Sequence, residues 1–428
     1  MKTRQQEASL KFILTFALTL ISGLSLAQEI PWASSAEEVG MSTERLERIN
    51  HAIQRHIDAG NIQGAVTAVA RHGKLVHFEA HGLMDVPNNR PMQEDNIFIM
   101  MSSTKPVLGV AAMMMIEEGL VRPTDPVSKW IPEFAEMEVA VLRTPLDQNI
   151  SPIRVDPENI PPYRLVPAAR EITVHDLLTH TSGLASGGLG SAIMAERGPT
   201  PRGSGRTLAS NAPEYGDYIL DFQPGSRWQY SAATGLDVIA RIVEIESGMP
   251  FNQFVQERIF EPLGMNNSWW NVPEEYQDRR VVIVDRDMAP FFDTQPTTYF
   301  AGSYGLNSTA GDYLRFEQML VNGGELFGNR LLSPRTVRMM SSNQVKDLYQ
   351  GISRRVEGQG FGYTVAVTMD PIVGNQRRTE GAFGWGGAFG TRSWSDPEEG
   401  LTAVLMLQQP YGPAQSDFEN AVQQAIIE

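Results

Sequence analysis

The hydrophobic pattern near the start of the chain predicts a helix followed by a β-hairpin. Apolar residues recur at helical spacing in TERLERINHAIQRHIDAG, with Ser42 as a candidate N-cap and Gly60 as a stop signal. Residues 64–82 then carry two runs rich in Val and Ala, separated by a turn at residues 71–74. A second helix is expected over residues 103–119, where the run AAMMMIEEG ends the apolar pattern.

The middle of the chain is predicted to be mainly helical, and its last part contains strands. Residues 134–170 are rich in proline and polar residues and predict a long excursion. Residues 174–184 predict a short helix that ends in a turn, followed by a Gly/Ser/Pro-rich loop to about residue 211, and two further helices are expected over 234–248 and 251–264. Strands are predicted at 362–370, 390–396 and 401–409, with a closing helix at 416–428.

Strands at both ends and helices between them predict an α+β fold. The simplest packing places the N- and C-terminal strands in one antiparallel sheet flanked by helices, with an inserted, mainly helical lobe. The 428 residues, 42% hydrophobic and 20% charged, have an ordinary globular composition and are sufficient for one large domain.

The first residues have the layout of a signal peptide. Lys2, Arg4 and Lys11 precede an apolar run over residues 12–26, and Ser25 and Ala27 supply small residues at positions −3 and −1. We therefore predict a signal peptide over residues 1–27, an N-terminal extension over 28–41 and one large domain over 42–428. A retained membrane anchor is the alternative for this segment. The absence of cysteine excludes disulfides and a lipoprotein anchor, and export predicts a bacterial periplasmic or secreted protein.

The charge of the chain excludes one class of partner. The formal net charge is −15, and removing residues 1–27, which carry +2, leaves −17. This is the wrong sign for binding nucleic acid or an anionic membrane, so we expect neither as a partner.

A serine and a lysine three residues apart are the first candidates for chemistry. In the stretch IMMSSTKPVL, Ser102 and Lys105 form the only S-x-x-K of the chain. On a helix both side chains project from one face, and Pro106 is tolerated in the first turn. With Ser102 as N-cap, an amine near the positive end of the helix dipole can accept the proton of a serine nucleophile.

Other nucleophiles and metal sites are less well supported. A Ser-His-Asp triad on a G-x-S-x-G elbow needs a late histidine, but all seven histidines lie at or before His180, and the nearest elbow surrounds Ser303. The histidine pairs are five residues apart and H-E-x-x-H is absent, so we expect no metal site and no cofactor.

Five motifs resemble the serine β-lactamase and penicillin-binding-protein superfamily, and within it most closely the family VIII, β-lactamase-like carboxylesterases. They are SSTK (102–105), LLTHTSGL (177–184), YSA (230–232), IFEPLGMNNS (259–268) and GWGGAFGTRSWSDP (384–397). The resemblance implies the β-lactamase/transpeptidase-like fold and a site without metal. It implies that Tyr230 relays protons with Lys105, and that the N–H groups of Ser102 and Ala388 form an oxyanion hole beside Trp385, Gly386 and Gly387. His180 is expected to shape the turn beside the site through backbone hydrogen bonds.

Two residues depart from the family pattern. Trp385 replaces a lysine that could hold a carboxylate, and Ala232 replaces an asparagine. Both changes favour small neutral esters over acidic peptides or lactams, although Arg392 on the following strand could restore a carboxylate partner. The sequence therefore predicts an exported carboxylesterase of class EC 3.1.1 that works through an acyl-enzyme on Ser102. The alternatives are a β-lactamase, a D-amino-acid peptidase or amide hydrolase with the same machinery, and a penicillin-binding sensor that does not turn over.

Overall fold

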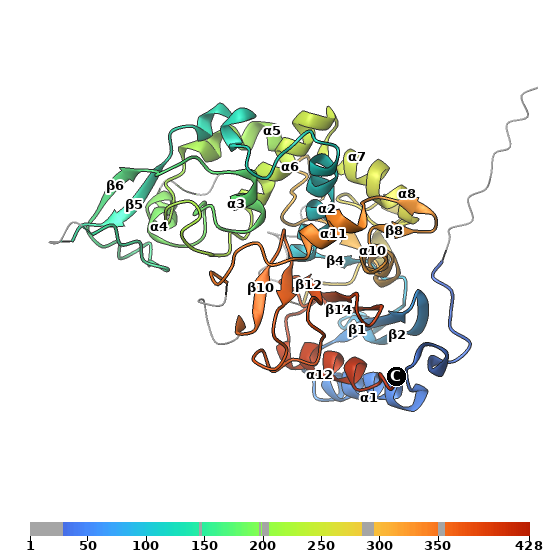
Figure 1. Cartoon of the computed structure of the whole chain (residues 1–428). Coiled ribbons are helices and arrows are strands. Elements are labelled where there is room, and N and C mark those ends of the chain that lie inside the picture. The colour runs from blue at the N-terminus through green and yellow to red at the C-terminus, as the bar shows by residue number, and fades with distance from the viewer. Residues whose placement is uncertain (1–28, 145–147, 197, 199–204, 285–294, 350–355) are drawn as a thin grey trace, which may run out of the picture.

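The computed structural model describes residues 29–144, 148–196, 198, 205–284, 295–349 and 356–428 (Figure 1). The predicted signal peptide lies outside these residues. The part of the predicted N-terminal extension that is described contacts the domain, since Trp32 pairs with Leu75 and Met41 with Ile426. In the described part of the chain, no helix combines the length and apolar character needed to cross a bilayer.

An antiparallel sheet of eight strands forms the centre of the structure, which confirms the predicted α+β class. β1 (Gly64–Arg71) pairs with β14 (Leu401–Met406), so segments from the two ends of the chain lie side by side. In order across the sheet the strands are β10 (Gln359–Phe361), β11 (Ala366–Thr368), β12 (Phe383–Gly386), β13 (Arg392–Asp396), β14, β1, β2 (Lys74–Asp85) and β3 (Arg90–Pro91).

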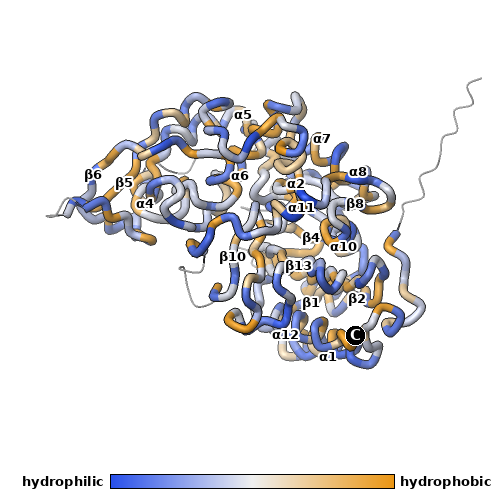
Figure 2. The backbone as a smooth tube through the Cα atoms, in the orientation of Figure 1, coloured by the Kyte–Doolittle hydropathy of each residue, from blue (hydrophilic) through white to orange (hydrophobic). Residues whose placement is uncertain are grey.

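Helices cover both faces of this sheet. α1 (Thr43–Asp58) and α12 (Gly412–Gln423) pack on one face, and α10 (Ala310–Val321) packs on the other. All eight residues of β1 are therefore buried, with Val69 in the core under α1 and Val66 in the core on the opposite side. Hydrophobic and hydrophilic positions alternate along α1 and α12 in Figure 2, as expected for helices with one face on a sheet.

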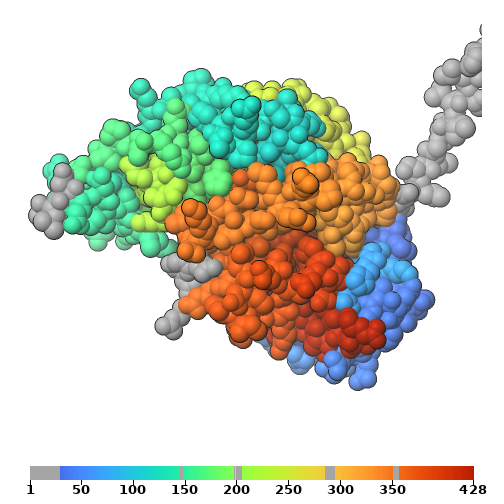
Figure 3. Space-filling model, in the orientation of Figure 1, coloured from blue at the N-terminus to red at the C-terminus, as the bar shows by residue number. Residues whose placement is uncertain are grey.

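The helical lobe lies against one end of the sheet (Figures 1 and 3). α2 (Thr104–Glu117) is buried from Thr104 to Met115. The helix therefore runs through the core and begins at the boundary with the sheet. The other helices of this part are α3 (Val174–Leu178), α4 (Leu189–Ala195), α5 (Leu208–Asn211), α6 (Thr234–Ser247), α7 (Phe251–Val255), a π-helical turn (Gln256–Phe260), α8 (Glu261–Leu263) and α11 (Pro334–Met340).

Several local predictions are wrong for identifiable reasons. The closing helix is α12, which starts four residues earlier than predicted because Pro413 is compatible with a first helical turn. Only Ala366–Thr368 of the strand predicted at 362–370 is extended, because Thr364 adopts a left-handed φ of 69° and closes a turn.

The two stretches predicted as loops contain regular structure. The excursion at 134–170 includes the two-stranded ribbon of β5 (Glu138–Leu142) and β6 (Tyr163–Pro167), which projects from the lobe in Figure 1. The Gly/Ser/Pro-rich loop contains the short helices α4 and α5. The buried carboxylate of Asp221 organises this loop, since it accepts hydrogen bonds from the backbone and hydroxyl groups of Ser186 and Ser191.

Two histidines of β2, His77 buried and His81 half-buried, predict acid sensitivity. His77 Nε2 and His81 Nε2 lie 2.7 Å and 3.1 Å from the hydroxyl of Thr67. Burial lowers the pKa of His77 to about 3 and that of His81 to about 4. In the unfolded chain both histidines titrate near pH 6.5. Below that pH they therefore bind more protons in the unfolded chain than in the folded chain. The free energy of unfolding should fall as the pH drops from 7 to 5, by on the order of 2 kcal/mol for each histidine.

Urea unfolding at pH 7 and pH 5 measures this effect. A His77→Gln variant, which keeps a hydrogen-bonding group beside Thr67, should show a weaker dependence on pH. The matched control is His51→Gln, because His51 is exposed on α1. If the free energy of unfolding depends on pH equally in His77→Gln and in the unchanged protein, His77 is not a source of the acid sensitivity.

Candidate active site

A strained turn presents Ser102 at the start of α2. Residues Met101–Ser103 form a 3₁₀ turn, and Met101 has a left-handed φ of 48°, which is uncommon for a non-glycine residue. The surrounding structure holds this turn, since Met100 N–H donates to Leu306 O and the Tyr313 hydroxyl donates to Ser103 O. Ser102 was expected as the N-cap of the helix, but α2 begins at Thr104 and the hydroxyl of Ser102 is directed elsewhere.

The structure brings Ser102, Lys105 and Tyr230 into mutual contact. Ser102 Oγ lies 3.0 Å from Lys105 Nζ and 2.9 Å from Tyr230 Oη. Lys105 Nζ also lies 5.2 Å from the centroid of the Tyr230 ring. Tyr230 is 128 residues from Ser102 in the sequence, so the fold itself assembles this group.

Two carbonyl groups orient the amine of Lys105. Its Nζ donates to Ala232 O at 2.8 Å and to Ser303 O at 2.7 Å, and its side chain is 0% exposed. With two hydrogens held by carbonyls, the remaining tetrahedral position of the nitrogen faces Ser102 Oγ. That position donates a proton when the group is an ammonium and offers a lone pair when it is an amine. The geometry is therefore suited to moving a proton to or from the serine.

Aromatic rings hold Tyr230 in place. The ring of Trp385 lies 5.6 Å from that of Tyr230, and the ring of His180 lies 4.8 Å away in an edge-on arrangement. Trp228 and Phe361 complete the cluster around His180. The tryptophan that replaces the family lysine therefore packs on the tyrosine of the site and supplies no charge.

His180 combines a backbone role with burial among these rings. Its carbonyl accepts a hydrogen bond from Gln229 N–H, and its backbone adopts a φ of 60°. Neither ring nitrogen has a hydrogen-bond partner among the residues that the structure describes, and burial together with the charge of Lys105 holds the pKa of His180 well below its ordinary value. The imidazole is thus neutral and has no contact through which it could take a proton from Ser102.

The end of β12 lies against the turn that carries Ser102. Gly387 is so close to this turn that a Cβ built on it would lie 2.3 Å from Met100 O and 2.3 Å from Thr391 Oγ1. Gly387 N–H donates to Thr391 O, whereas Ala388 N–H has no acceptor among the residues that the structure describes. Ala388 is exposed one residue beyond this contact, which is the position expected for an oxyanion donor.

A cavity of about 730 Å³ adjoins the site on the side of Tyr230. Half of its lining comes from residues 226–230, and the rest comes from the two stretches predicted as loops and from the segment around Leu348. The residues that line it include Ile153, Ser186, Trp228, Gln229, Tyr230 and Leu348. Its mixed apolar and polar lining provides space for a small organic substrate.

Asp237 is a site residue that sequence analysis missed. Its carboxylate, 0% exposed on α6, accepts hydrogen bonds from both the N–H and the hydroxyl of Ser303, at 3.2 Å and 2.6 Å. The hydroxyl of Tyr299 donates to it as well, at 2.8 Å. Asp237 therefore fixes the residue whose carbonyl holds Lys105, and Ser303 itself is occupied as a donor. The only signal in the sequence was an aspartate inside the helix predicted over residues 234–248.

An Asp237→Asn variant should lose about tenfold in kcat and show a shifted pH–rate profile. The amide would present a donor to a group of donors, so Ser303 would move and Lys105 would lose its fixed orientation. The pH dependence of kcat measures this positioning role. The control is Asp312→Asn, because Asp312 is also buried but accepts from Asn267 N–H and the hydroxyl of Ser268. If Asp237→Asn is less stable but its pH dependence of kcat is unchanged, Asp237 has a structural role only.

The described residues contain no group of three or more histidine, aspartate or glutamate side chains that could hold a metal ion. The three groups that meet here are a hydroxyl, an amine and a phenol, beside the end of β12. This arrangement defines a serine hydrolase with the β-lactamase fold. The chain belongs to the beta-lactamase family, whose sequence pattern matches residues 49–426.

Similar proteins include enzymes of known type. Protein Rv1367c of Mycobacterium tuberculosis is 34% identical over 379 residues, which cover 83% of this chain and 88% of that protein. Esterase EstB of Burkholderia gladioli is 28% identical over 406 residues, covering 89% of this chain and 94% of EstB. The solved structure of EstCE1, a hydrolase with promiscuous acyltransferase activity, matches with a TM-score of 0.70 and 23% identity over 90% of this chain and 99% of EstCE1.

Proposed function

We propose that this protein is an exported hydrolase of small carboxylic esters, of class EC 3.1.1, that works through an acyl-enzyme on Ser102. The observation that carries the proposal is the contact of one partly exposed hydroxyl with both a buried amine and a phenol. No imidazole takes part. The similarity to the esterase EstB supports an ester as substrate.

The proposed reaction has two halves. Ser102 Oγ attacks the ester carbonyl while its proton passes to the pair formed by Lys105 and Tyr230, which titrates as a coupled unit. The N–H groups of Ser102 and Ala388 stabilise the oxyanion. Tyr230 returns the proton to the alkoxide oxygen, the alcohol leaves, and the acyl group remains on Ser102. Water then attacks the acyl-enzyme, and its proton returns through the same pair to Ser102 as the acid is released.

Export to a bacterial periplasm or to the medium is part of the proposal. It rests on the basic start, the apolar run and the small residues before position 28. N-terminal sequencing of protein isolated from the periplasm or medium tests it. A mature chain that begins at or near Gln28 is expected, and an intact Met1 on a membrane-bound product would contradict it.

Two assays on one preparation test the activity. Para-nitrophenyl butyrate should be turned over many times per active site, whereas nitrocefin should be hydrolysed slowly or not at all. Fast nitrocefin turnover with negligible butyrate hydrolysis would instead identify a β-lactamase. A single burst of product followed by no further release would identify a penicillin-binding sensor.

A further inference from the structure

A buried glutamate that the proposed reaction does not use lies between α10 and β13. Glu317, 1% exposed, projects from α10, and its two carboxylate oxygens accept hydrogen bonds from the hydroxyl groups of Ser393 and Ser395, at 2.6 Å and 2.7 Å. Trp394, between these serines, is on the opposite face of the strand and packs against Phe418 of α12. The carboxylate therefore bridges two successive residues on the face of β13 that is turned toward α10.

The start of β13 connects the two halves of the proposed oxyanion site. Thr391, the residue before β13, accepts a hydrogen bond from Gly387 N–H at its carbonyl, and its hydroxyl lies 2.9 Å from the hydroxyl of Ser103. The first contact belongs to the strand end that carries Ala388, and the second belongs to the turn that carries Ser102. A displacement of β13 therefore changes the distance between the N–H groups of Ser102 and Ala388.

The helix that carries Glu317 also holds the serine turn. Tyr313 lies about one turn earlier on α10 and donates its hydroxyl to Ser103 O at 2.7 Å. Burial and the charge of Glu317 raise the pKa of Tyr313 well above its ordinary value, so the phenol keeps its proton and remains a donor. α10 thus contacts one half of the oxyanion site through Tyr313 and the strand of the other half through Glu317.

Glu317 changes its charge in weakly acidic solution. Burial raises its pKa to about 6, against the hydrogen bonds from Ser393 and Ser395 and the charge of Arg378, which lower it. A carboxylate is an acceptor only, so both serine hydroxyls can donate to it. A proton on one carboxylate oxygen places a donor opposite a donor, and one of the two serines then has to turn or move away.

The charged group that acts on Glu317 is Arg378, on the far side of β13. Its guanidinium lies 4.5 Å from the ring centroid of Trp394 and is paired with Glu419. Apart from Tyr313, the titratable side chains of α10, β1, β8 (Glu325–Leu326), β13, β14 and α8 lie on the opposite face of the sheet, contact other residues or are exposed. They are Arg71, Glu261, Asp312, Arg315, Glu325, Arg392 and Asp396.

We propose that Glu317 is a positioning residue for the reaction at Ser102: its carboxylate fixes β13, and β13 sets the distance between the two oxyanion donors. This inference rests on the proposed function and adds a regulation of the same site. The ionised carboxylate keeps the donors of Ser102 and Ala388 in place. When it is protonated, β13 shifts and the attack of Ser102 slows. Glu317 takes no part in proton transfer to or from the substrate.

A Glu317→Gln variant resembles the protonated state at every pH, because its amide places a donor opposite one serine hydroxyl. The labelling rate of Ser102 by a fluorophosphonate and kcat/KM with para-nitrophenyl butyrate are measured between pH 5 and pH 8, wherever circular dichroism shows a folded protein. Both rates of the unchanged protein should fall below an apparent pKa of about 6. The variant should be about tenfold slower at pH 7.5 and should lack this acid limb.

Two further variants separate positioning from a structural role. Ser395→Ala removes a hydrogen bond that lowers the pKa of Glu317, so the acid limb should move to higher pH. This variant remains informative if Glu317→Gln fails to fold. The matched control is Asp312→Asn, because Asp312 is also buried on α10 and burial also raises its pKa, but its hydrogen-bond partners lie outside β12 and β13. This control should keep the acid limb where it is.

Three results would overturn the inference. They are an unchanged protein without an acid limb near pH 6, a limb that persists in Glu317→Gln or stays in place in Ser395→Ala, and equal rates of Glu317→Gln and the unchanged protein at pH 7.5. Failure of the proposed ester hydrolysis is a separate outcome. Para-nitrophenyl butyrate would then not be turned over, while the labelling rate of Ser102 would still report on Glu317.

Discussion

A Lys105→Met variant is expected to lose at least about 10³-fold in kcat with para-nitrophenyl butyrate. Lys105 Nζ contacts oxygen atoms of Ser102, Ala232 and Ser303, so its removal takes away the amine that can exchange a proton with the serine. Methionine has a similar volume and can occupy the same buried channel, so the variant should still fold. Circular dichroism and a thermal melt check the folding, and steady-state kinetics give kcat.

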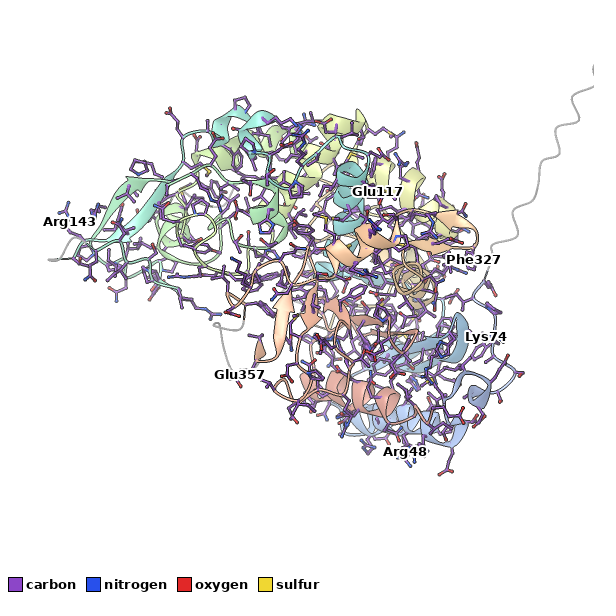
Figure 4. All side chains as sticks on the ribbon, in the orientation of Figure 1. Arg48, Lys74, Glu117, Arg143, Phe327 and Glu357 are labelled. Carbon is purple, nitrogen blue, oxygen red and sulfur yellow. The ribbon has the colours of Figure 1, made fainter. Side chains whose placement is uncertain are left out.

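Lys74→Met is the matched control for this variant. Lys74 is the first residue of β2, and Figure 4 shows it well apart from Glu117, the last residue of α2. Its exposed ion pair with Glu38 contributes little to stability, so both kcat and the melting temperature should stay close to those of the unchanged protein. A Lys105→Met variant within about tenfold of the unchanged protein would contradict the role of the amine.

A Gly387→Ala variant should lose about 10² to 10³-fold in kcat/KM. The added Cβ would lie 2.3 Å from the backbone oxygen of Met100 and 2.3 Å from Thr391 Oγ1, so the end of β12 has to move away from the serine turn. The N–H of Ala388 moves with it and no longer meets the developing oxyanion. The same clash should lower the free energy of unfolding by about 1–3 kcal/mol.

Gly412→Ala provides the control for this effect. Gly412 begins α12, and a Cβ built there meets nothing within 4 Å. The substitution should change neither kcat/KM nor the unfolding midpoint by a measurable amount. If Gly387→Ala hydrolyses esters as fast as Gly412→Ala, the strand end does not contribute to the oxyanion site.

The parts of the fold that could be predicted from the sequence are those with strong local signals. The helix after Ser42, the hairpin at 64–82 and the strands at 390–396 and 401–409 each carry a clear period or a clear stop. The ribbon of β5 and β6 was missed because each strand is stabilised by the other across a long intervening segment. Local patterns carry no information on such a pairing.

The candidate site shows the same division between local and distant information. Ser102 and Lys105 are neighbours on one turn, so their contact follows from spacing alone. Tyr230 and the strand end at Gly387 required the motifs of a family, because only the fold brings them together. Asp237 belongs to no motif used in the sequence analysis. Its part in the site became visible through its hydrogen bonds to Ser303 and the contact of Ser303 with Lys105.

Covalent labelling with a fluorophosphonate, followed by peptide mass spectrometry, tests the central claim most directly. The account predicts one adduct per chain, on the peptide that contains Ser102, with none in Ser102→Ala and much slower labelling in Lys105→Met. An adduct on Ser303 or any other residue, or full labelling of Ser102→Ala, would contradict it.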